Sequence, residues 1–538
     1  MGEDIRRTRV LIVGAGPAGL TLACELARRG IPCLLAEKSD GPPAGSRGKG
    51  LQPRTLEILE DLGVLDEVRA HGGLYPPLQV RREGQVVYTG RMDPLRDVTP
   101  DVPYPNVWML PQWRTGELLS GRLAALGGGV SYRTELVSLR PDDTGVTAVL
   151  RDDDGEAVVR AGYLVGADGG HSTVRRALGI GFAGQTREEQ RMIVADVRAT
   201  GVSRDNWHVW TAPGEGAGAF QLGLCPLAGT DSFQLTAPVT PGAAVPALTG
   251  DGLQRAADAA AGPGAVRITG VTWASLYRTN IRMAERFRAG RVFLAGDAAH
   301  VHSPAGGQGL NTSIQDAYNL AWKLAAVLGG APARLLDSYE GERLPVAADV
   351  LGISTRLHDR AVEAEPDAHR RDDPELRQLN LGYRHSGLTE ELRAQPGPVR
   401  AGDRAPDAPG QDADGKPARL FGFLHGGAVT LLAFGPAAAR LAAEVPARPG
   451  AAVRTVTVAL PPGPDPLEAA DPAADAGPAR PTGLFVDADG HARRAYGVPE
   501  GQQAVMVIRP DGYVGLAADC DALASPRLAR YLAAICAG

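Results

Sequence analysis

The chain has 538 residues, of which 44% are hydrophobic and 22% charged, and its formal net charge is −6. At about 150 residues per domain, this length predicts three to four domains, and the composition is that of a globular protein with a sizeable core. The net negative charge argues against nucleic acid or an anionic membrane surface as a partner, because both bind basic faces.

Five cysteines are scattered along the chain, and no two of them have C-x-x-C spacing. A dispersed, odd set of cysteines is not a disulfide framework, so we expect a reducing compartment, the cytoplasm. The sequence contains no run of 18 apolar residues, so we expect no membrane-spanning helix. We expect no metal site.

The N-terminal segment reads as one β–α–β unit with a glycine-rich turn. Residues 8–13 predict a buried strand, residues 20–29 a helix, and residues 32–36 a second strand that ends at Glu37. Between the first strand and the helix, Gly14-Ala15-Gly16-Pro17-Ala18-Gly19 matches the dinucleotide fingerprint G-x-G-x-x-G.

Each part of this fingerprint has a physical role. Gly14 allows a tight turn, Gly16 lets a pyrophosphate approach the backbone, and Gly19 lets helix and strand pack closely. Glu37 can accept a hydrogen bond from a ribose hydroxyl and would repel a 2′-phosphate. The turn therefore predicts binding of NAD or FAD rather than NADP. The alternative, a turn that merely needs glycines, leaves the strand, helix and acid unexplained.

Further along the chain, residues 53–70 and 114–126 predict helices, and residues 130–139 and 145–151 predict strands. A buried strand over residues 163–167 then brings Asp168 to a second turn, Asp168-Gly169-Gly170-His171-Ser172, before a basic helix start. Taken alone, this turn is compatible with an ordinary strand-to-helix connection.

From about residue 180 to 280 the pattern changes to alternation of apolar and polar residues. It is clearest in residues 207–211, 219–225 and 232–238, and it is typical of antiparallel strands with one buried face.

A third motif follows a buried strand at residues 291–296. It contains Gly296-Asp297 and the turn from Pro304 to Gly309, which leads into a predicted helix over residues 309–328. The N-terminus of that helix offers backbone donors and a positive dipole to an anion. A loop that only caps a long helix is the alternative.

The C-terminal part reads as a separate unit. Residues 333–358 are expected to be helical, and residues 364–418 to form a linker with some helix. Strands are expected at residues 429–434, 453–459, 505–508 and 513–515, and helices at 435–445 and 525–536.

The three motifs together, over roughly residues 8–355, resemble those of the class A flavoprotein monooxygenases. More narrowly, the chain resembles the aromatic polyketide hydroxylases, relatives of phenol hydroxylase with a third, thioredoxin-like domain, through Ala401–Pro406 and Val507–Tyr513. The last domain lacks C-x-x-C, so we expect packing or subunit contacts there instead of redox chemistry.

This resemblance implies an α/β fold with a Rossmann-type, glutathione-reductase-like FAD-binding domain, an antiparallel-sheet substrate domain and a thioredoxin-like α/β domain. The expected boundaries are 1–178 and 281–395 for the two parts of the FAD domain, 179–280 for the substrate domain, and 400–538 for the thioredoxin-like domain.

The resemblance also implies an FAD site assembled from all three motifs. Its expected members are Gly14, Gly16, Pro17, Ala18, Gly19, Glu37, Lys38, Arg47, Gln112, Leu136, Asp168, Gly296, Asp297, Pro304, Gly307, Gly309, Leu310 and Asn311. Arg47 is expected at the pyrophosphate or flavin, Gln112 at the ribityl chain, and Pro304 near flavin C4a.

The activity implied is hydroxylation of a polycyclic aromatic, polyketide-type phenol through a flavin C4a-hydroperoxide. FAD is expected to be bound, with NADPH or NADH as a transient co-substrate and O2 as oxidant. We identify no catalytic base, and we expect structural roles for His300 and His302.

The substrate is expected under the antiparallel sheet, and ordinary sheet core is the alternative reading of the same apolar set. That set is Trp210, Phe220, Leu222, Phe233 and Leu235.

Other functions of such a flavin site stay open. They are Baeyer–Villiger or epoxidising oxygenation, inactivation of an antibiotic, and a non-oxygenating flavin-binding role. A homodimer is also left open. The sequence offers no second G-x-G-x-x-G unit, so NAD(P)H is expected to bind only transiently.

Overall fold

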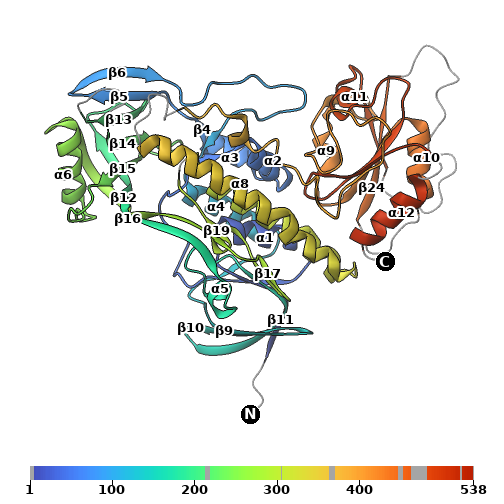
Figure 1. Ribbon diagram of the computed structural model, residues 1–538, viewed down its shortest axis with the longest axis horizontal. Coiled ribbons are helices and arrows are strands. Elements are labelled where there is room, and N and C mark those ends of the chain that lie inside the picture. The colour runs from blue at the N-terminus through green and yellow to red at the C-terminus, as the bar shows by residue number, and fades with distance from the viewer. Residues whose placement is uncertain are drawn as a thin grey trace. The chain divides into compact units, whose positions relative to one another are not determined.

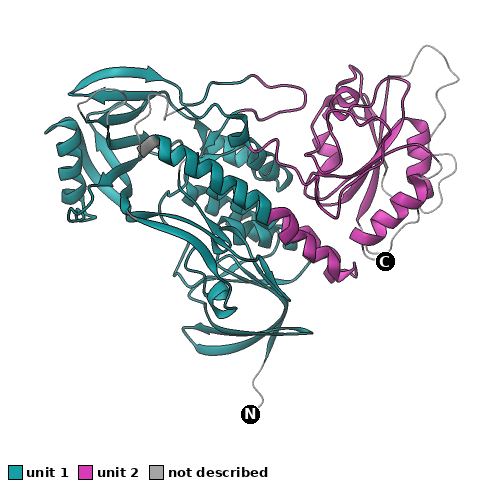
Figure 2. Ribbon diagram, in the orientation of Figure 1, with its two compact units in different colours: residues 1–96, 106–317, 344–377 teal, residues 97–105, 318–343, 378–538 magenta. Residues whose placement is uncertain are grey.

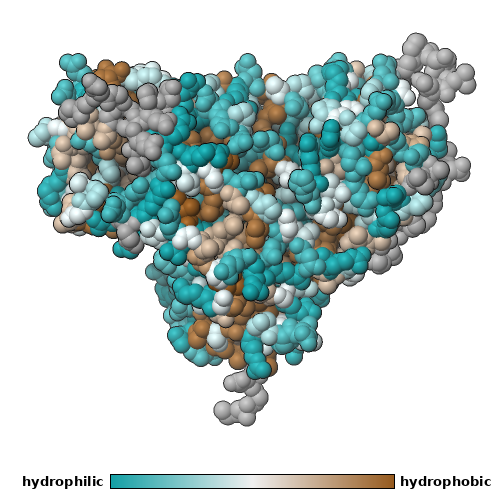
Figure 3. All heavy atoms as spheres, in the orientation of Figure 1, coloured by the Kyte–Doolittle hydropathy of each residue, from teal (hydrophilic) through white to brown (hydrophobic). Residues whose placement is uncertain are grey.

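A computed structural model describes residues 5–212, 219–304, 306–362, 370–445, 452–461, 482–521 and 524–536. Ala305 of the third motif and residues 363–369 of the expected linker lie outside these ranges. The chain forms two compact units (Figure 2): residues 1–96, 106–317 and 344–377, and residues 97–105, 318–343 and 378–538. On the face seen in Figure 3, hydrophilic side chains cover most of the surface, with smaller hydrophobic areas interspersed.

The first unit contains a largely parallel sheet built on the predicted N-terminal strand. Strand β1 (Arg6–Val13) lies between β11 (Gly155–Gly166) and β2 (Cys33–Ala36) and is parallel to both. Val10, Leu11 and Ile12, in its C-terminal half, are fully buried, as is typical of a parallel strand covered on both faces. The sheet also contains β8 (Val130–Ser131), β9 (Glu135–Asp142), β10 (Gly145–Asp152), β17 (Arg288–Ala289) and β18 (Val292–Leu294).

Proline and glycine residues mark where helices in this part begin and end. Pro17 occupies the first turn of α1 (Pro17–Ala27). Proline is tolerated there because the backbone N–H that it lacks would have no partner within the helix. The expected helix over residues 53–70 is instead two helices, because Gly63 adopts a φ of 72° between them. The other helices here are α2 (Pro53–Asp61), α3 (Leu65–His71), α4 (Gln112–Ala125) and α5 (Thr173–Ala177), with 3-10 turns η1 (Gly296–Ala298) and η3 (Pro374–Arg377). Helices α7 (Gly309–Leu328) and α8 (Asp337–Val362) each have residues in both units, and the 3-10 turn η2 (Ala333–Leu336) belongs to the second unit.

A second sheet in this unit is mostly antiparallel (Figure 1). Its strands, in spatial order, are β19 (His300–Val301), β16 (Arg267–Ala284), β12 (Phe182–Thr200), β15 (Phe233–Val239), β14 (Phe220–Pro226), β13 (Trp207–Thr211), β5 (Leu78–Arg82) and β6 (Gln85–Gly90). One face packs on α6 (Gly250–Ala261) through Leu253 and Ala257. A small sheet joins β3 (Gly50–Leu51), β7 (Trp108–Met109) and β4 (Gly73–Leu74).

The second unit has its own eight-stranded mixed sheet, with an apolar core on each face. In spatial order the strands are β20 (Glu390–Glu391), β27 (Val514–Asp519), β26 (Ala504–Ile508), β23 (Val429–Phe434), β24 (Val453–Ala459), β25 (Thr482–Val486), β21 (Pro409–Gln411) and β22 (Pro417–Arg419). Its helices include α9 (Phe421–Leu424), α10 (Pro436–Glu444), α11 (His491–Tyr496) and α12 (Ala524–Ile535).

Four charged side chains are buried together in the second unit. Arg509 donates to both carboxylate oxygens of Glu342, at 2.7 and 2.9 Å, and also binds Asp511. Lys323 donates to Glu342 at 2.7 Å. Burial alone would raise the pKa of Glu342, but Arg509 and Lys323 hold it below its ordinary value. Two cations and two carboxylates thus balance one another without solvent.

Removing one cation should break this balance. Arg509→Met leaves two buried carboxylates with Lys323 alone, so we expect the free energy of unfolding to fall by about 3–5 kcal/mol. Denaturant unfolding followed by fluorescence measures the change. Arg527→Met is the matched control, because Arg527 is half-exposed and 3.8 Å from Glu390, and it should cost under about 1 kcal/mol. Equal losses in both variants would contradict the assignment.

Candidate cofactor and substrate site

The glycine turn after β1 has the geometry that its sequence predicts. Gly14 adopts a φ of 103°, and a Cβ there would lie 2.4 Å from the carbonyl oxygen of Ala167. A Cβ on Gly19 would lie 1.9 Å from the carbonyl oxygen of Gly14. Gly16 differs, because a Cβ added to it meets nothing within 4 Å. The turn is therefore tight where helix and strands pack, and open at the N-terminus of α1, where an anion is favoured.

Glu37 is held beside this turn. One carboxylate oxygen accepts the N–H of Ala15 at 2.8 Å, and the other accepts the backbone and hydroxyl donors of Ser39 at 3.0 Å. The carboxylate is thus fixed next to the glycine turn, where a ribose hydroxyl can donate to it. Lys38 is exposed, whereas Leu136 on β9 is 4% exposed and offers little surface to a ligand.

Asp168 ends β11 and begins the second motif. Its Oδ2 accepts the N–H groups of Thr173 at 2.7 Å and Val174 at 3.1 Å, so it caps α5. Its Oδ1 is buried and has no hydrogen-bond partner among the described residues. A buried carboxylate oxygen of this kind is ordinarily satisfied, so Asp168 has capacity for a donor from a bound molecule.

The third motif is fastened to α7 by a buried carboxylate. Asp316 accepts the N–H of Gly296 at 3.0 Å and bonds to His300 at 2.7 Å. A Cβ on Gly296 would lie 3.2 Å from the Cβ of Ala18 on α1, so the first and third motifs are in contact. Asp297, in η1, stays exposed.

Two amides position the loop that carries Arg47. Gln112 accepts the N–H of Gly48 at 2.9 Å. Asn311, fully buried, accepts the N–H of Gln52 at 2.8 Å and donates to the carbonyl of Gly50 at 2.9 Å. The loop is thereby tied to the N-terminal turn of α7.

The structure brings the three motifs into contact, and most of the expected cofactor residues keep accessible surface. Asn311 is an exception, because its side chain is committed to the loop. The accessible members are Gly16, Pro17, Glu37, Lys38, Arg47, Gln112, Asp168, Asp297, Pro304, Gly307, Gly309 and Leu310. An open helix N-terminus, an acid beside it and an unsatisfied Asp168 oxygen fit the ADP and flavin parts of FAD.

The two histidines of the third motif take part in buried contacts. His302 bonds through Nδ1 to the carbonyl of Ser303 at 3.0 Å, and burial lowers the pKa of His302. The Ser303 hydroxyl lies 3.0 Å from His358, which reaches Gln190 at 2.6 Å. No sequence pattern indicates His358 or Gln190, since they are distant along the chain and share no motif.

The apolar set expected at the substrate is divided by the structure. Trp210, Leu222, Phe233 and Leu235 are at most 4% exposed and pack in the core against α6. For these four, sheet core is the correct description. Phe220 lies on the other face, because the register shifts between Trp210 and Thr211; its ring is beside Gly223.

The opposite face of this sheet is polar, and sequence reasoning missed it. Cys225, Gln234 and Asp196 are aligned as partners across β14, β15 and β12. This face contacts the loop of Arg47, since Gln234 donates to the carbonyl of Ser46 and receives a hydrogen bond from Lys49.

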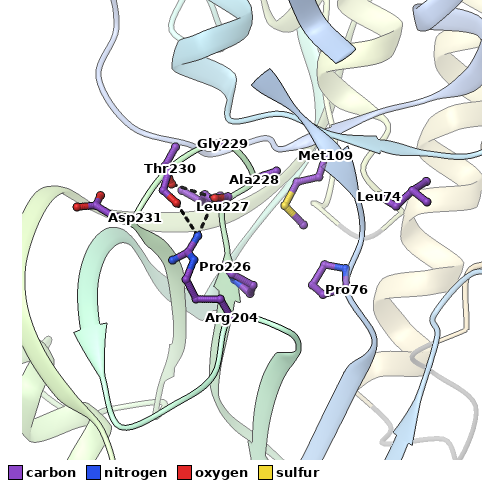
Figure 4. Close-up of a pocket in the computed structure, with 10 residues that line it drawn as sticks. All are labelled: Leu74, Pro76, Met109, Arg204, Pro226, Leu227, Ala228, Gly229, Thr230 and Asp231. Carbon is purple, nitrogen blue, oxygen red and sulfur yellow. Dashed lines mark hydrogen bonds between the residues drawn. The ribbon is translucent and has the colours of Figure 1, made fainter. Parts of the chain in front are cut away.

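A pocket of about 760 Å³ lies at the β14–β15 turn (Figure 4). Its volume is within the range usual for small-molecule sites. The guanidinium of Arg204 is committed to the turn, donating to the carbonyls of Leu227 at 3.0 Å and Thr230 at 2.7 Å. The lining residues are Leu74, Pro76, Met109, Arg204, Pro226, Leu227, Ala228, Gly229, Thr230 and Asp231.

The dinucleotide turn and the third motif in contact with it fit the fold of an FAD-dependent oxidoreductase. Residues 7–354 match the FAD binding domain family, and the chain belongs to that family.

Similar proteins define the activity. A flavin-dependent monooxygenase of Mycobacteroides abscessus is 47% identical over 431 residues, covering 79% of this chain and 88% of the relative. The 12-dehydrotetracycline 5-monooxygenase/anhydrotetracycline 6-monooxygenase of Streptomyces rimosus is 36% identical over 503 residues, covering 84% and 93%. The structure of aklavinone-11 hydroxylase with FAD and aklavinone superposes with a TM-score of 0.79, at 28% identity and 99% coverage of both chains. The protein is an FAD-dependent monooxygenase that uses NAD(P)H and O2.

Reversing the charge of Glu37 tests the cofactor site. Glu37→Arg removes the ribose acceptor, so we expect FAD affinity to fall at least about tenfold, in keeping with about 1.5–3 kcal/mol for a hydrogen bond to a charged group. Flavin absorbance per chain after gel filtration gives the occupancy, and circular dichroism checks the fold. Asp154→Arg, in an exposed turn, is the matched control and should retain FAD. Full occupancy in Glu37→Arg would remove Glu37 from the site.

Described residues include no helix with both the length and the apolarity to cross a membrane.

Proposed function

We propose that this enzyme hydroxylates a polycyclic aromatic phenol. The observation that carries the proposal is the loop at residues 45–50, which serves both sides of the site. Arg47 lies on it next to Gly48, which is fixed by Gln112, and Lys49 lies on it in contact with the polar sheet face. The names of relatives that act on tetracyclines and aklavinone support a fused-ring substrate, and the pocket of about 760 Å³ is large enough for one.

When bound, FAD would supply the redox chemistry by which NAD(P)H provides electrons and O2 provides one oxygen atom, the other leaving as water. We assign the chain's own contributions as follows. The N-terminus of α1 and Glu37 bind the ADP half, and Arg47 and Asp297 bind near the pyrophosphate and ribityl chain. The N-terminal turn of α7, at Gly309 and Leu310, stabilises negative charge by its dipole. Pro304 excludes water beside it.

We also infer the finer domain division, with FAD-domain parts at 1–178 and 281–395, a substrate domain at 179–280 and a thioredoxin-like domain at 400–538. Parallel pairing of β23 with β24 and antiparallel pairing of β23 with β26 support the last assignment. A redox role does not fit it, since burial raises the pKa of Cys520 to about 11. None of the five cysteines, all within the described ranges, forms a disulfide, which fits a reducing, cytoplasmic setting.

The activity is tested with a panel of fused-ring phenols. We expect anhydrotetracycline or alizarin to stimulate NADPH oxidation by the holoenzyme and to gain one oxygen atom, read by mass spectrometry. Product regiochemistry distinguishes ring hydroxylation from Baeyer–Villiger oxygenation and epoxidation. Glu37→Arg, depleted of FAD, serves as the inactive control. NADPH oxidation without any oxygenated phenol across the panel would argue for another substrate class.

The thiols of the C-terminal domain should be dispensable. Cys536 is 4% exposed in an apolar core, with Cys520 packed against it, and buried thiols act as small hydrophobes. We expect the double variant Cys520→Ser/Cys536→Ser to keep turnover within about twofold, under oxidising and reducing conditions alike. A folded, FAD-loaded double variant with a large loss of turnover would show that these thiols take part in catalysis.

A further inference from the structure

Lys49 places an ammonium group on the polar face of the second sheet. Its Nζ donates to the side-chain oxygen of Gln234 on β15 and lies 4.4 Å from the ring centroid of Trp207 on β13. Its backbone is held as well, because its carbonyl accepts the N–H of Leu110 at 2.9 Å. An amide and an aromatic face therefore hold this cation, and neither of them neutralises its charge.

The carboxylate nearest this cation, Asp196, is not hydrogen-bonded to it, unlike the paired charges of the second unit. Asp196 is 3% exposed, and its Oδ1 has no hydrogen-bond partner within the described part of the chain. Burial raises the pKa of Asp196 to about 6, although Ser46 and Lys49 oppose the rise. Burial likewise lowers the pKa of Lys49, although the nearby Cys225 and Asp196 act to raise it. Both ions are thus costly to bury in this arrangement.

Other titratable groups near the ammonium stay neutral at pH 7. Burial raises the pKa of Cys225, on β14, to about 11. Burial also raises the pKa of Tyr75, whose hydroxyl is so close to Gly50 that a Cβ there would lie 2.8 Å away. Arg204 is the further charged neighbour of Cys225, and its guanidinium is committed to backbone carbonyls.

This surface is accessible as well as polar. Lys49, Tyr75 and Trp207 are half-buried, while Gln234 and Asp196 are buried beneath them. The 760 Å³ pocket is lined by chain neighbours of this face: Leu74 and Pro76 flank Tyr75 along the chain, and Pro226 follows Cys225.

We propose that Lys49 is a specificity-determining residue that binds the ionised oxygen of an acidic phenol or enol at the polar sheet face, beside Trp207 and Tyr75. This inference rests on the proposed function. An opposite charge at close range favours the ionised form and lowers an acid's pKa by about 1–3 units. A neutral phenol that binds in this way breaks its O–H bond, and the proton passes to solvent. The ionised oxygen then enriches the adjacent ring carbons in electrons, which favours their attack by an electrophilic oxygen.

The test uses the holoenzyme and alizarin, a fused-ring phenol whose neutral and ionised forms differ in colour. We expect the apparent pKa of bound alizarin to lie at least about 1 unit below that of free alizarin in the wild type. Lys49→Met and Lys49→Gln should each abolish this shift and weaken binding of the ionised form about tenfold or more. Lys49→Arg should restore much of the shift, because it keeps the charge.

Three controls separate this role from a structural one. Lys416→Met removes an exposed lysine and should change nothing. Flavin absorbance confirms that each variant stays loaded with FAD. Alizarin dimethyl ether cannot ionise, so its affinity should be the same in wild type and Lys49→Met.

The outcomes are distinguishable. An unchanged alizarin pKa in FAD-loaded Lys49→Met, or equal loss of affinity for alizarin and its dimethyl ether, would overturn the role of Lys49 while leaving the proposed hydroxylation intact. Failure of the wild type to bind alizarin and anhydrotetracycline would contradict the phenolic substrate class itself, and with it both proposals.

Discussion

The buried carboxamide of Asn311 is the contact on which the geometry of the site depends. One side chain, with no exposed surface, accepts the N–H of Gln52 and donates to the carbonyls of Gly50 and Gly307. It thereby holds the loop before α2 and the turn before α7 at a fixed distance. Because an unsatisfied buried amide would cost about 1–3 kcal/mol, separating the two segments is unfavourable. Arg47 and Lys49 are both held by this arrangement, on opposite sides of Gly48.

A second constraint is the two-residue period of the strands. In β14 and β15, every second side chain packs on α6. The side chains between them, which include Cys225 and Gln234, lie on the opposite face, which contacts the loop of Arg47. A shift by one residue would exchange these sets. Phe220 shows the same constraint from the other side, since a single irregularity next to Trp210 moves its ring to the polar face.

These two constraints explain what the sequence could and could not predict. The glycine turn, the strands around it and the bounds of α7 depend on local patterns, so they were predictable. The break at Gly63 was not, because the apolar spacing continues across it and only the positive φ reveals it. The sequence also left open whether the apolar set of the second sheet was core or ligand surface, because alternation shows only that a strand has two faces; the structure places four of the five residues in the core. Lys49 depends on Gln234, far along the chain, so no local pattern indicates it.

The structure also shows how to distinguish a buried charge that supports the fold from one that is available to a ligand. In the second unit, Arg509 and Lys323 meet Glu342 and Asp511 in equal number, and each carboxylate is hydrogen-bonded. Such a set is complete, and nothing further is required to satisfy it. The polar sheet face is incomplete by the same standard, because Lys49 rests on a neutral amide and an oxygen of Asp196 has no partner among the described residues. Folding alone does not account for that cost, whereas a bound anion beside Lys49 would offset part of it. The incomplete set, rather than the more strongly charged one, is therefore where chemistry is expected.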